Sequence, residues 1–144
     1  MSRIENKVTE LLKENICLKS DIKDINSQFD DERKNIFLDI LQIVDTFERA
    51  ELSIRDRQLN TDANTKKAIE RLLTAKKKTL SVLEKHGITK IFFENNIAND
   101  DYCITIDVEP DNNHTNNYIL SIEKEGYLIK QKLLREAEVI VVKN

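Results

Sequence analysis

Glycine and proline are scarce in this chain of 144 residues, which has two glycines, one proline and no tryptophan. Collagen-like and Pro/Gly-rich chains are excluded, because both are built from residues that are nearly absent here. So few glycines and prolines also leave few obligatory turns. The composition therefore favours long uninterrupted helices over a many-stranded β-sandwich, in a chain whose length suits one ordinary domain.

Long apolar runs are missing as well. No stretch approaches the roughly 18 consecutive apolar residues of a membrane-spanning helix, and the N-terminal residues alternate charged with apolar side chains instead of forming a signal-peptide core. Cys17 and Cys103 lie far apart, and neither belongs to a C-x-x-C pair, so reduced thiols are expected. We predict a cytoplasmic protein without a membrane partner, a metal or a cofactor.

The charge is acidic on average but unevenly distributed. The formal net charge is −3 for the whole chain. Residues 1–57 carry 10 basic and 13 acidic side chains, residues 58–87 carry 7 and 3, and residues 88–144 carry 6 and 10. The basic middle segment therefore lies between two acidic ones, and a general nucleic-acid partner is not expected.

Residues 4–29 carry apolar side chains at alternating steps of four and three, the a/d spacing of a coiled coil. One core position is polar: Asn15 occupies an a position, where a buried asparagine favours a parallel dimer in fixed register. The alternative is a single amphipathic helix lying on a core, but no other segment is long enough to cover this seam. We predict a homodimer whose seam residues are Val8, Leu11, Asn15, Leu18, Ile22, Ile25 and Phe29.

The heptad frame slips at residues 30–34, and beyond them the apolar stripe broadens. A stripe of this width is typical of a helix that packs against two or three neighbours in a bundle. We predict one helix from about Ser2 to Arg57, roughly 80 Å long and so too long for a compact monomer. Its second half adds three residues to the predicted dimer interface: Ile40, Val44 and Phe47.

A second helix is expected after the polar segment 58–65. In that segment Asn60 can take the left-handed conformation, and Thr61 or Asp62 can cap the next helix. The helix is expected to end at His86 and Gly87, a basic residue in the last turn followed by a glycine just beyond it. Two copies of both helices would form a four-helix bundle.

After Gly87 the hydrophobic period changes from helical to alternating. Strands are predicted over 88–93, 102–108, 118–122, 127–134 and 138–142, with a hairpin-like turn at 123–126. The fold class is therefore α+β, with a small antiparallel β domain at the C-terminus. We predict three parts: a coiled-coil helix over 1–34, a helical dimerisation region over 35–87 and a β-wing domain over 88–144.

Signatures of catalysis are not found. The sequence has no nucleophile elbow, P-loop, Rossmann or zinc motif, and two glycines do not make a Gly-rich phosphate loop. His86 is best explained as a cation at a helix C-terminus, and His114 as an exposed loop residue. We expect no enzyme and no small-molecule substrate.

The most distinctive residues form the segment 126–142. Glycine, an aromatic, an aliphatic, a basic residue, two aliphatics, arginine, alanine and an aliphatic recur there at set spacings: Gly126, Tyr127, Ile129, Lys132, Leu133, Leu134, Arg135, Ala137 and Val139. This pattern resembles the signature of the GrpE family, nucleotide exchange factors for DnaK-type chaperones. Residues 41–50 are similar to the family's "LLPVIDNLERAL" segment, and residues 83–88 to its "L-x-x-x-G-[VI]" segment.

The resemblance implies a function without chemistry on the nucleotide. A member of this family binds the ATPase domain of a DnaK-type chaperone and holds its nucleotide cleft open, so that ADP leaves. Carried over from the matching motif, Lys132 and Arg135 are the expected charged contacts with the chaperone and Val141 an apolar one; Arg33 and Lys34 are weaker candidates on the helix. A structural ion pair of Arg135 with a neighbour such as Glu123 or Glu125 is an equal alternative. Three other matching residues are expected to serve helix packing or pairing between subunits: Asp45, Glu48 and Arg49.

One half of the family pattern is replaced. The family carries Asp-Pro-x-x-His-x-Ala before the last hairpin, whereas this chain has Tyr102 in place of the histidine and Ile104 in place of the alanine. The replacement motivates an alternative function, a coiled-coil adaptor or holdase of the same architecture without exchange activity. A small enzyme built on the β domain and a nucleic-acid binder are more remote alternatives; the latter would lose binding steeply with added salt.

Replacing Asn15 by isoleucine should keep the helices associated but loosen their register or change the number of chains. The reason is that a buried asparagine at an a position penalises every alignment except the one that pairs it with its copy. Sedimentation equilibrium across a concentration series measures the outcome. A variant that remains one sharply dimeric species would remove Asn15 from this argument.

Overall fold

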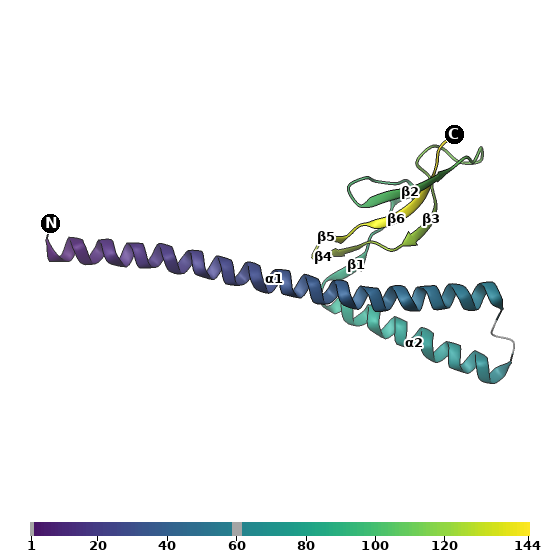
Figure 1. The fold of residues 1–144 in the computed structure, drawn as a ribbon, viewed down its shortest axis with the longest axis horizontal. Coiled ribbons are helices and arrows are strands. Elements are labelled where there is room, and N and C mark those ends of the chain that lie inside the picture. The colour runs from purple at the N-terminus through teal and green to yellow at the C-terminus, as the bar shows by residue number, and fades with distance from the viewer. Residues whose placement is uncertain (1, 59–61) are drawn as a thin grey trace. The chain divides into compact units, whose positions relative to one another are not determined.

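The computed structural model describes residues 2–58 and 62–144 of the chain (Figure 1). The chain has two compact units, residues 1–37 and 38–144. The second unit holds the end of the first helix, the second helix and all the strands. The predictions for Asn60 and Thr61 lie outside the described residues. The three-part division made from the sequence stays a prediction.

Helix α1 spans Arg3–Arg57, which confirms the single long helix predicted from periodicity. A capping box starts it: the Ser2 hydroxyl accepts a hydrogen bond from the Glu5 amide, and the Ser2 amide donates to the Glu5 carboxylate. Helix α2 spans Ala63–Lys85 and has Asp62 as its N-cap, whose carboxylate accepts a 2.7 Å hydrogen bond from the Thr65 amide. Asp62 is thus the cap that the sequence offered as one of two candidates.

Gly87 ends the second helix as predicted. His86 is the C-cap residue, and Gly87 follows with φ of +81°, the left-handed conformation in which a side chain is strained. The Gly87 carbonyl accepts a 2.8 Å hydrogen bond from the Lys130 amide, so the end of the helix is tied to the β domain at this point.

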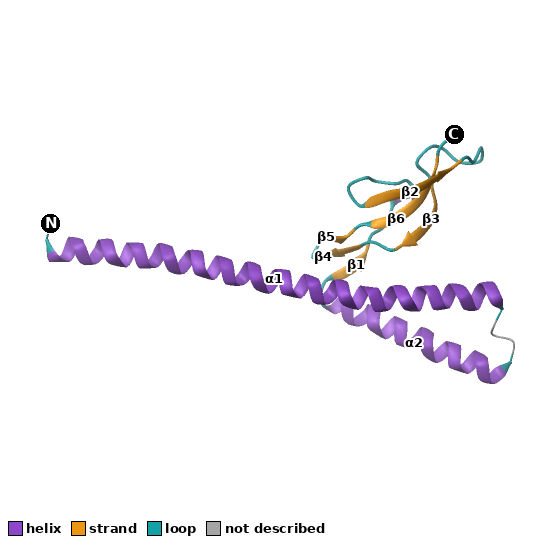
Figure 2. Cartoon of the chain, in the orientation of Figure 1, coloured by secondary structure: helices purple, strands orange, loops and turns teal. Residues whose placement is uncertain are grey.

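The β domain contains two three-stranded sheets (Figure 2). In the first sheet β1 (Ile88–Lys90), β4 (Tyr127–Ile129) and β5 (Lys132–Arg135) pair antiparallel in the order β1-β4-β5. In the second sheet β6 (Ala137–Val142) lies between β2 (Cys103–Glu109), to which it is parallel, and β3 (Ile119–Lys124), to which it is antiparallel. A 3-10 turn, η1 (Glu94–Asn96), precedes β2.

The α+β class is confirmed, and the pairing of the strands differs from the prediction in two ways. The β2–β6 pair is parallel, so the domain is mixed rather than wholly antiparallel. Residues 123–126 do not form a hairpin turn: residues 123 and 124 are the end of β3, and β3 and β4 belong to different sheets. The tight turn lies instead within the predicted strand 127–134: Lys130 and Gln131 both have positive φ, 48° and 69°, and connect β4 to β5.

This turn escaped sequence reasoning because neither of its residues is a turn residue. A two-residue hairpin with positive φ at both positions is the type I′ geometry, in which Asn-Gly is preferred. Lys130 and Gln131 adopt it against their intrinsic preference. Pairing on both sides holds them there, since β4 and β5 have three registered residue pairs.

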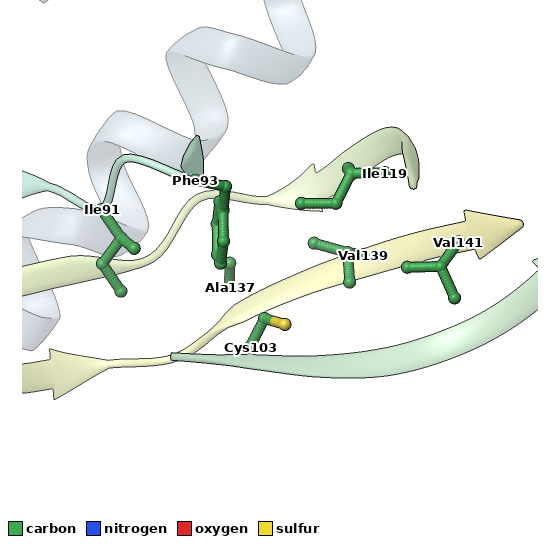
Figure 3. Close-up of a cluster of buried hydrophobic side chains, with 7 residues drawn as sticks. All are labelled: Ile91, Phe93, Cys103, Ile119, Ala137, Val139 and Val141. Atoms are coloured by element: carbon green, nitrogen blue, oxygen red, sulfur yellow. The ribbon is translucent and has the colours of Figure 1, made fainter. Parts of the chain in front are cut away.

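The core of the β domain is one cluster of buried side chains from β2, β3, β6 and the segment after β1 (Figure 3). Its members are Ile91, Phe93, Cys103, Ile119, Ala137, Val139 and Val141. The alternation along β6 explains the cluster, because every second residue from Ala137 to Val141 is buried. Other buried residues lie on the helices and the first sheet: Leu41, Val44, Leu83, Ile88, Tyr127 and Ile129.

Gly126 has no room for a side chain. A Cβ at this position would lie 2.6 Å from the Ala137 amide nitrogen and 2.7 Å from the Ile91 side chain. Gly126 also accepts a 3.0 Å hydrogen bond from the Ile91 amide through its carbonyl. The glycine that opens the C-terminal motif is therefore required, because a Cβ there would collide with the backbone at the start of β6.

Replacing Gly126 by alanine should destabilise the β domain by at least about 1–3 kcal/mol, the usual cost of overpacking a core, because backbone rather than a flexible side chain opposes the new methyl group. Urea unfolding monitored by tyrosine fluorescence measures the loss. Thr89→Ala, at an exposed position on β1, is the control and should be near neutral. An unfolding free energy unchanged by Gly126→Ala would contradict the close approach.

Candidate partner-binding site

Arg135 at the end of β5 forms a two-pronged ion pair with a residue of α1. Its Nη1 and Nη2 donate to the two carboxylate oxygens of Asp45 on α1, each at 2.8 Å. The side chains are only 12% and 14% exposed, respectively. A two-pronged pair of this kind fixes direction as well as distance. It joins residues that are 90 positions apart in the sequence.

The rest of the Arg135 guanidinium group is held by the β domain itself. Nε and Nη2 donate to the backbone carbonyl of Glu125 at 3.0 and 2.6 Å. The group lies 5.4 Å from the centre of the Tyr127 ring, within cation–π range. The structure therefore contains an ion pair of Arg135, as one of the two sequence interpretations required, but its acidic partner is Asp45 rather than Glu123 or Glu125.

Asp45 is the first of three acidic residues that lie one helical turn apart on α1. The next, Glu48, has carboxylate oxygen Oε1 3.3 Å from the Lys90 ammonium of β1 and 3.9 Å from that of Lys76 on α2. Glu51 accepts a 2.7 Å hydrogen bond from Lys76, which lowers its pKa. We call these three residues the acidic row of α1. Its bases on other elements come from β5, β1 and α2, and Arg55 of α1 itself lies 4.0 Å from Glu51.

Two groups beside this row are partly or wholly removed from solvent: Glu125 is half-buried, and Tyr127 is buried. Burial raises the pKa of Glu125 above its ordinary value of 4.5, and the nearby Lys90 only partly opposes the shift. Burial also raises the pKa of the Tyr127 hydroxyl. Among the described residues this hydroxyl is a buried side-chain group with no hydrogen-bond partner. Both groups indicate that the junction between α1 and the first sheet is drier than an ordinary surface.

The other residues predicted from the motif lie in different surroundings. Lys132, the first residue of β5, is exposed, as is its neighbour Leu133. Val141 is only 4% exposed and belongs to the buried cluster, so within this chain it acts in the core of the β domain. Of the three motif residues, Lys132 alone presents its side chain at the surface.

Arg33 and Lys34 lie on α1 within the unit 1–37. Arg33 is exposed, with Nη1 3.8 Å from an oxygen of Asp30, one turn earlier on the same helix. Lys34 is half-buried. Neither belongs to the unit that holds Lys132 and Arg135.

The predicted dimer seam is an uncovered apolar stripe within the single chain. Its residues on the first half of α1 are all about half exposed or more: Val8, Leu11, Leu18, Ile22, Ile25 and Phe29. Asn15 is exposed between them. On the second half of α1, Ile40 and Phe47 are half-buried, whereas Val44 is fully buried inside its own chain. The two helices also leave Ile43, Leu52, Leu72 and Val82 exposed in the unit 38–144.

The replaced half of the family pattern forms an ordered turn that leads into β2. The Asn99 carbonyl accepts hydrogen bonds from the Tyr102 and Cys103 amides at 2.9 and 3.1 Å, and the Asn99 side chain accepts one from the Asp101 amide. The Tyr102 carbonyl then accepts a 3.0 Å hydrogen bond from the Ala137 amide at the start of β6. The substituted residues thus still connect β2 to the C-terminal strand.

Within residues 2–58 and 62–144 no group of three or more histidine, cysteine, aspartate or glutamate side chains could hold a metal ion. The described helices also include none with the length and apolar character needed to cross a bilayer.

Comparison with known proteins agrees with this architecture. The sequence matches the GrpE family over residues 1–143. It is 31% identical over 112 residues to Protein GrpE 2 of Buchnera aphidicola, covering 78% of this chain and 57% of that protein. It is 30% identical over 115 residues to Protein GrpE of Alkaliphilus oremlandii, covering 76% and 56%. A mitochondrial GrpE protein homolog of Neurospora crassa is 29% identical over 112 residues, covering 74% and 47%.

These similarities define the class of this protein, whose structure combines a long helix, a second helix and a C-terminal β domain. The chain belongs to the GrpE family, and the resemblance predicted from its motifs is confirmed. It spans about half the length of the curated relatives that it matches.

Sequence reasoning missed most of the contacts made by the acidic row. Asp45 and Glu48 were expected to serve helix packing or pairing between subunits, and the structure pairs both within one chain with Arg135, Lys90 and Lys76. Their match to the family segment was the available signal, but it named the residues without their partners. The bases lie on other elements, and nothing local in the sequence connects them to α1.

Replacing Glu125 by glutamine should stabilise the protein at neutral pH. A carboxyl group whose pKa is raised on folding contributes its full stability below its ordinary value of 4.5 and loses that contribution as the pH rises through the folded-state pKa. Glutamine keeps the backbone carbonyl that binds Arg135 and removes the charge. Urea unfolding of both proteins between pH 4 and 8 should show an advantage of the variant that grows with pH. An advantage that is absent or shrinks with pH would contradict the burial of a charged Glu125.

Proposed function

We propose that this chain is an adenyl-nucleotide exchange factor, which binds the ATPase domain of a DnaK-type chaperone and promotes ADP release. The observation that carries the proposal is the Asp45–Arg135 ion pair. It joins the two family motifs, one on α1 and one in the C-terminal strands, into one assembled unit. Membership of the GrpE family supports the same function.

The mechanism needs no chemistry on the nucleotide. A partner that binds the open state of a nucleotide cleft more tightly than the closed state shifts the population toward the open one. A preference of about 4 kcal/mol shifts that population roughly a thousandfold. The protein therefore has to present a well-shaped surface rather than a reactive group, and we do not expect it to be an enzyme.

The β domain supplies most of the proposed contact. Lys132 offers a charge at its surface, with the exposed side chain of Leu133 beside it, and the ordered β4–β5 turn precedes both. Arg33 and Lys34 on α1 form a second, weaker patch. Val141 acts through the core that supports this surface.

A homodimer is part of the proposal. The uncovered stripe on the first half of α1 has the a/d spacing of a coiled coil, and a second copy of the helix would cover it. The exposed Ile43, Leu52, Leu72 and Val82 would contribute to a four-helix bundle with the same second copy. The predicted cytoplasmic location stays a prediction.

The test is the rate at which a fluorescent ADP analogue leaves a DnaK-type chaperone in excess unlabelled ATP. We expect a large, saturable acceleration by this protein. Lys132→Glu should weaken the interaction at least tenfold, or about 1.4 kcal/mol, because it reverses a charge at the contact. Lys143→Glu, at another exposed lysine of the same domain, is the matched control and should have little effect.

Two results would count against the proposal. Equal losses in both lysine variants would indicate a general charge effect rather than a contact at Lys132. No acceleration by the folded, dimeric protein would favour the adaptor or holdase, for which the replaced segment at Tyr102 is the motivation. That alternative predicts suppression of client aggregation without any change in ADP release.

A further inference from the structure

We propose that Asp45 is a positioning residue for nucleotide exchange: through Arg135 it holds the β domain at one angle to α1, so that the surface carrying Lys132 is braced against the chaperone. The inference rests on the proposed function and deepens it. Asp45 itself need not touch the partner.

The covalent connection between helices and strands is a single crossing. Helix α2 ends at Lys85, and β1 begins at Ile88 after the left-handed Gly87. The Lys130 amide ties this crossing to the β domain through one 2.8 Å hydrogen bond to the Gly87 carbonyl. Because glycine has more conformational freedom than any other residue, that single bond does not set the angle of the domain by itself. Contacts between the side chains of α1 and the strands add the remaining constraint.

Among the described residues, two ion pairs link α1 directly to the strands, and they differ in quality. Glu48 and Lys90 are 3.3 Å apart, and the Lys90 side chain is 41% exposed, so solvent screens this pair. Asp45 and Arg135 make two parallel hydrogen bonds, and both side chains are largely buried. Only the second pair fixes an orientation, because a planar guanidinium meets a carboxylate in one plane.

The β domain also binds the same guanidinium group. The Glu125 carbonyl accepts two hydrogen bonds from it, and the Tyr127 ring lies against it. Arg135 and Lys132 share the short strand β5, which pairs along its length with β4. A rotation of the β domain relative to α1 would therefore break the contacts of Arg135 and move Lys132 with the domain.

The consequence for exchange follows from differential binding. A rigid partner binds the open cleft and clashes with the closed one, whereas a loosely attached domain can follow the chaperone back to the closed state. Loss of the Asp45 contact should therefore lower the preference for the open state more than it lowers binding itself. In the exchange assay this is a drop in maximal release rate with a smaller change in half-saturating concentration.

The test compares Asp45→Asn with Glu51→Gln. The control breaks the 2.7 Å pair between Glu51 and Lys76, which links α1 to α2, and it removes neither of the ion pairs that Glu48 and Asp45 form with the strands. We expect Asp45→Asn to lower the maximal ADP-release rate at least fivefold, with less than a twofold change in half-saturation. Glu51→Gln should change neither. Equal behaviour of the two variants, or a change in half-saturation alone, would overturn the proposal.

A double substitution separates positioning from direct contact. If Arg135 acts through Asp45, then Asp45→Asn combined with Arg135→Gln should be no worse than either single change. A direct chaperone contact of Arg135 would instead add a rise in half-saturation to the effect of Asp45→Asn. The double variant also leaves no buried charge unpaired, so it keeps the test available should Asp45→Asn unfold.

Distances measured without the chaperone provide an independent readout. Spin labels at Asp56→Cys on α1 and Asn112→Cys in the β domain, both at exposed positions, report the angle between them. The exposed Cys17 is replaced by serine so that it takes up no label. Labelled chains are diluted with unlabelled ones so that distances are measured within one chain. The distance distribution should broaden in Asp45→Asn and stay narrow in Glu51→Gln. An unchanged width in Asp45→Asn would overturn the holding role. If the wild-type protein does not accelerate ADP release, the proposed function and the exchange role of Asp45 are both wrong. The distances would still show whether Asp45 holds the β domain against α1.

Discussion

The Asp45–Arg135 ion pair is the constraint on which the unit 38–144 depends. It crosses from a helix to a strand, and each member is mostly buried. A buried pair of this kind adds little net stability compared with a well-packed apolar pair, but loss of one partner leaves a charge with no water around it. Its value is therefore geometric: it excludes other arrangements of the strands against α1 rather than making one arrangement very stable.

The two glycines of the chain occupy two positions at which a side chain would be strained. Gly87 has the positive φ that ends α2, and Gly126 lies where a Cβ would meet the backbone of β6. The hairpin turn at Lys130 and Gln131 has the same left-handed geometry without a glycine. Because glycine is scarce, Lys130 and Gln131 adopt a strained backbone conformation at this turn, and the pairing of β4 with β5 holds them in it.

The candidate site was predictable in part. The motif identified Lys132 and Arg135, and the structure separates them: Lys132 is at the surface, and Arg135 is turned inward against Asp45. The seam residues from Val8 to Phe29 are uncovered in the single chain, as a dimer interface requires, whereas Val44 and Val141 are buried within it. A helical or alternating pattern shows which face of an element is apolar. The pattern does not show whether that face packs into the core of its own chain or against a second chain.

The sequence alone determined the elements whose causes are local. Helix α1 follows from periodicity and a capping box, α2 from the Asp62 cap and Gly87, and most strands from alternation, because each involves residues only a few positions apart. Tertiary structure decided the partners: β2 beside β6, Lys90 beside Glu48, and Asp45 beside Arg135, 90 residues away. The spacing of residues along the sequence allows many pairings of the same acids and bases. Packing of the whole chain selects among them, because it removes the Asp45–Arg135 pair from most of the solvent.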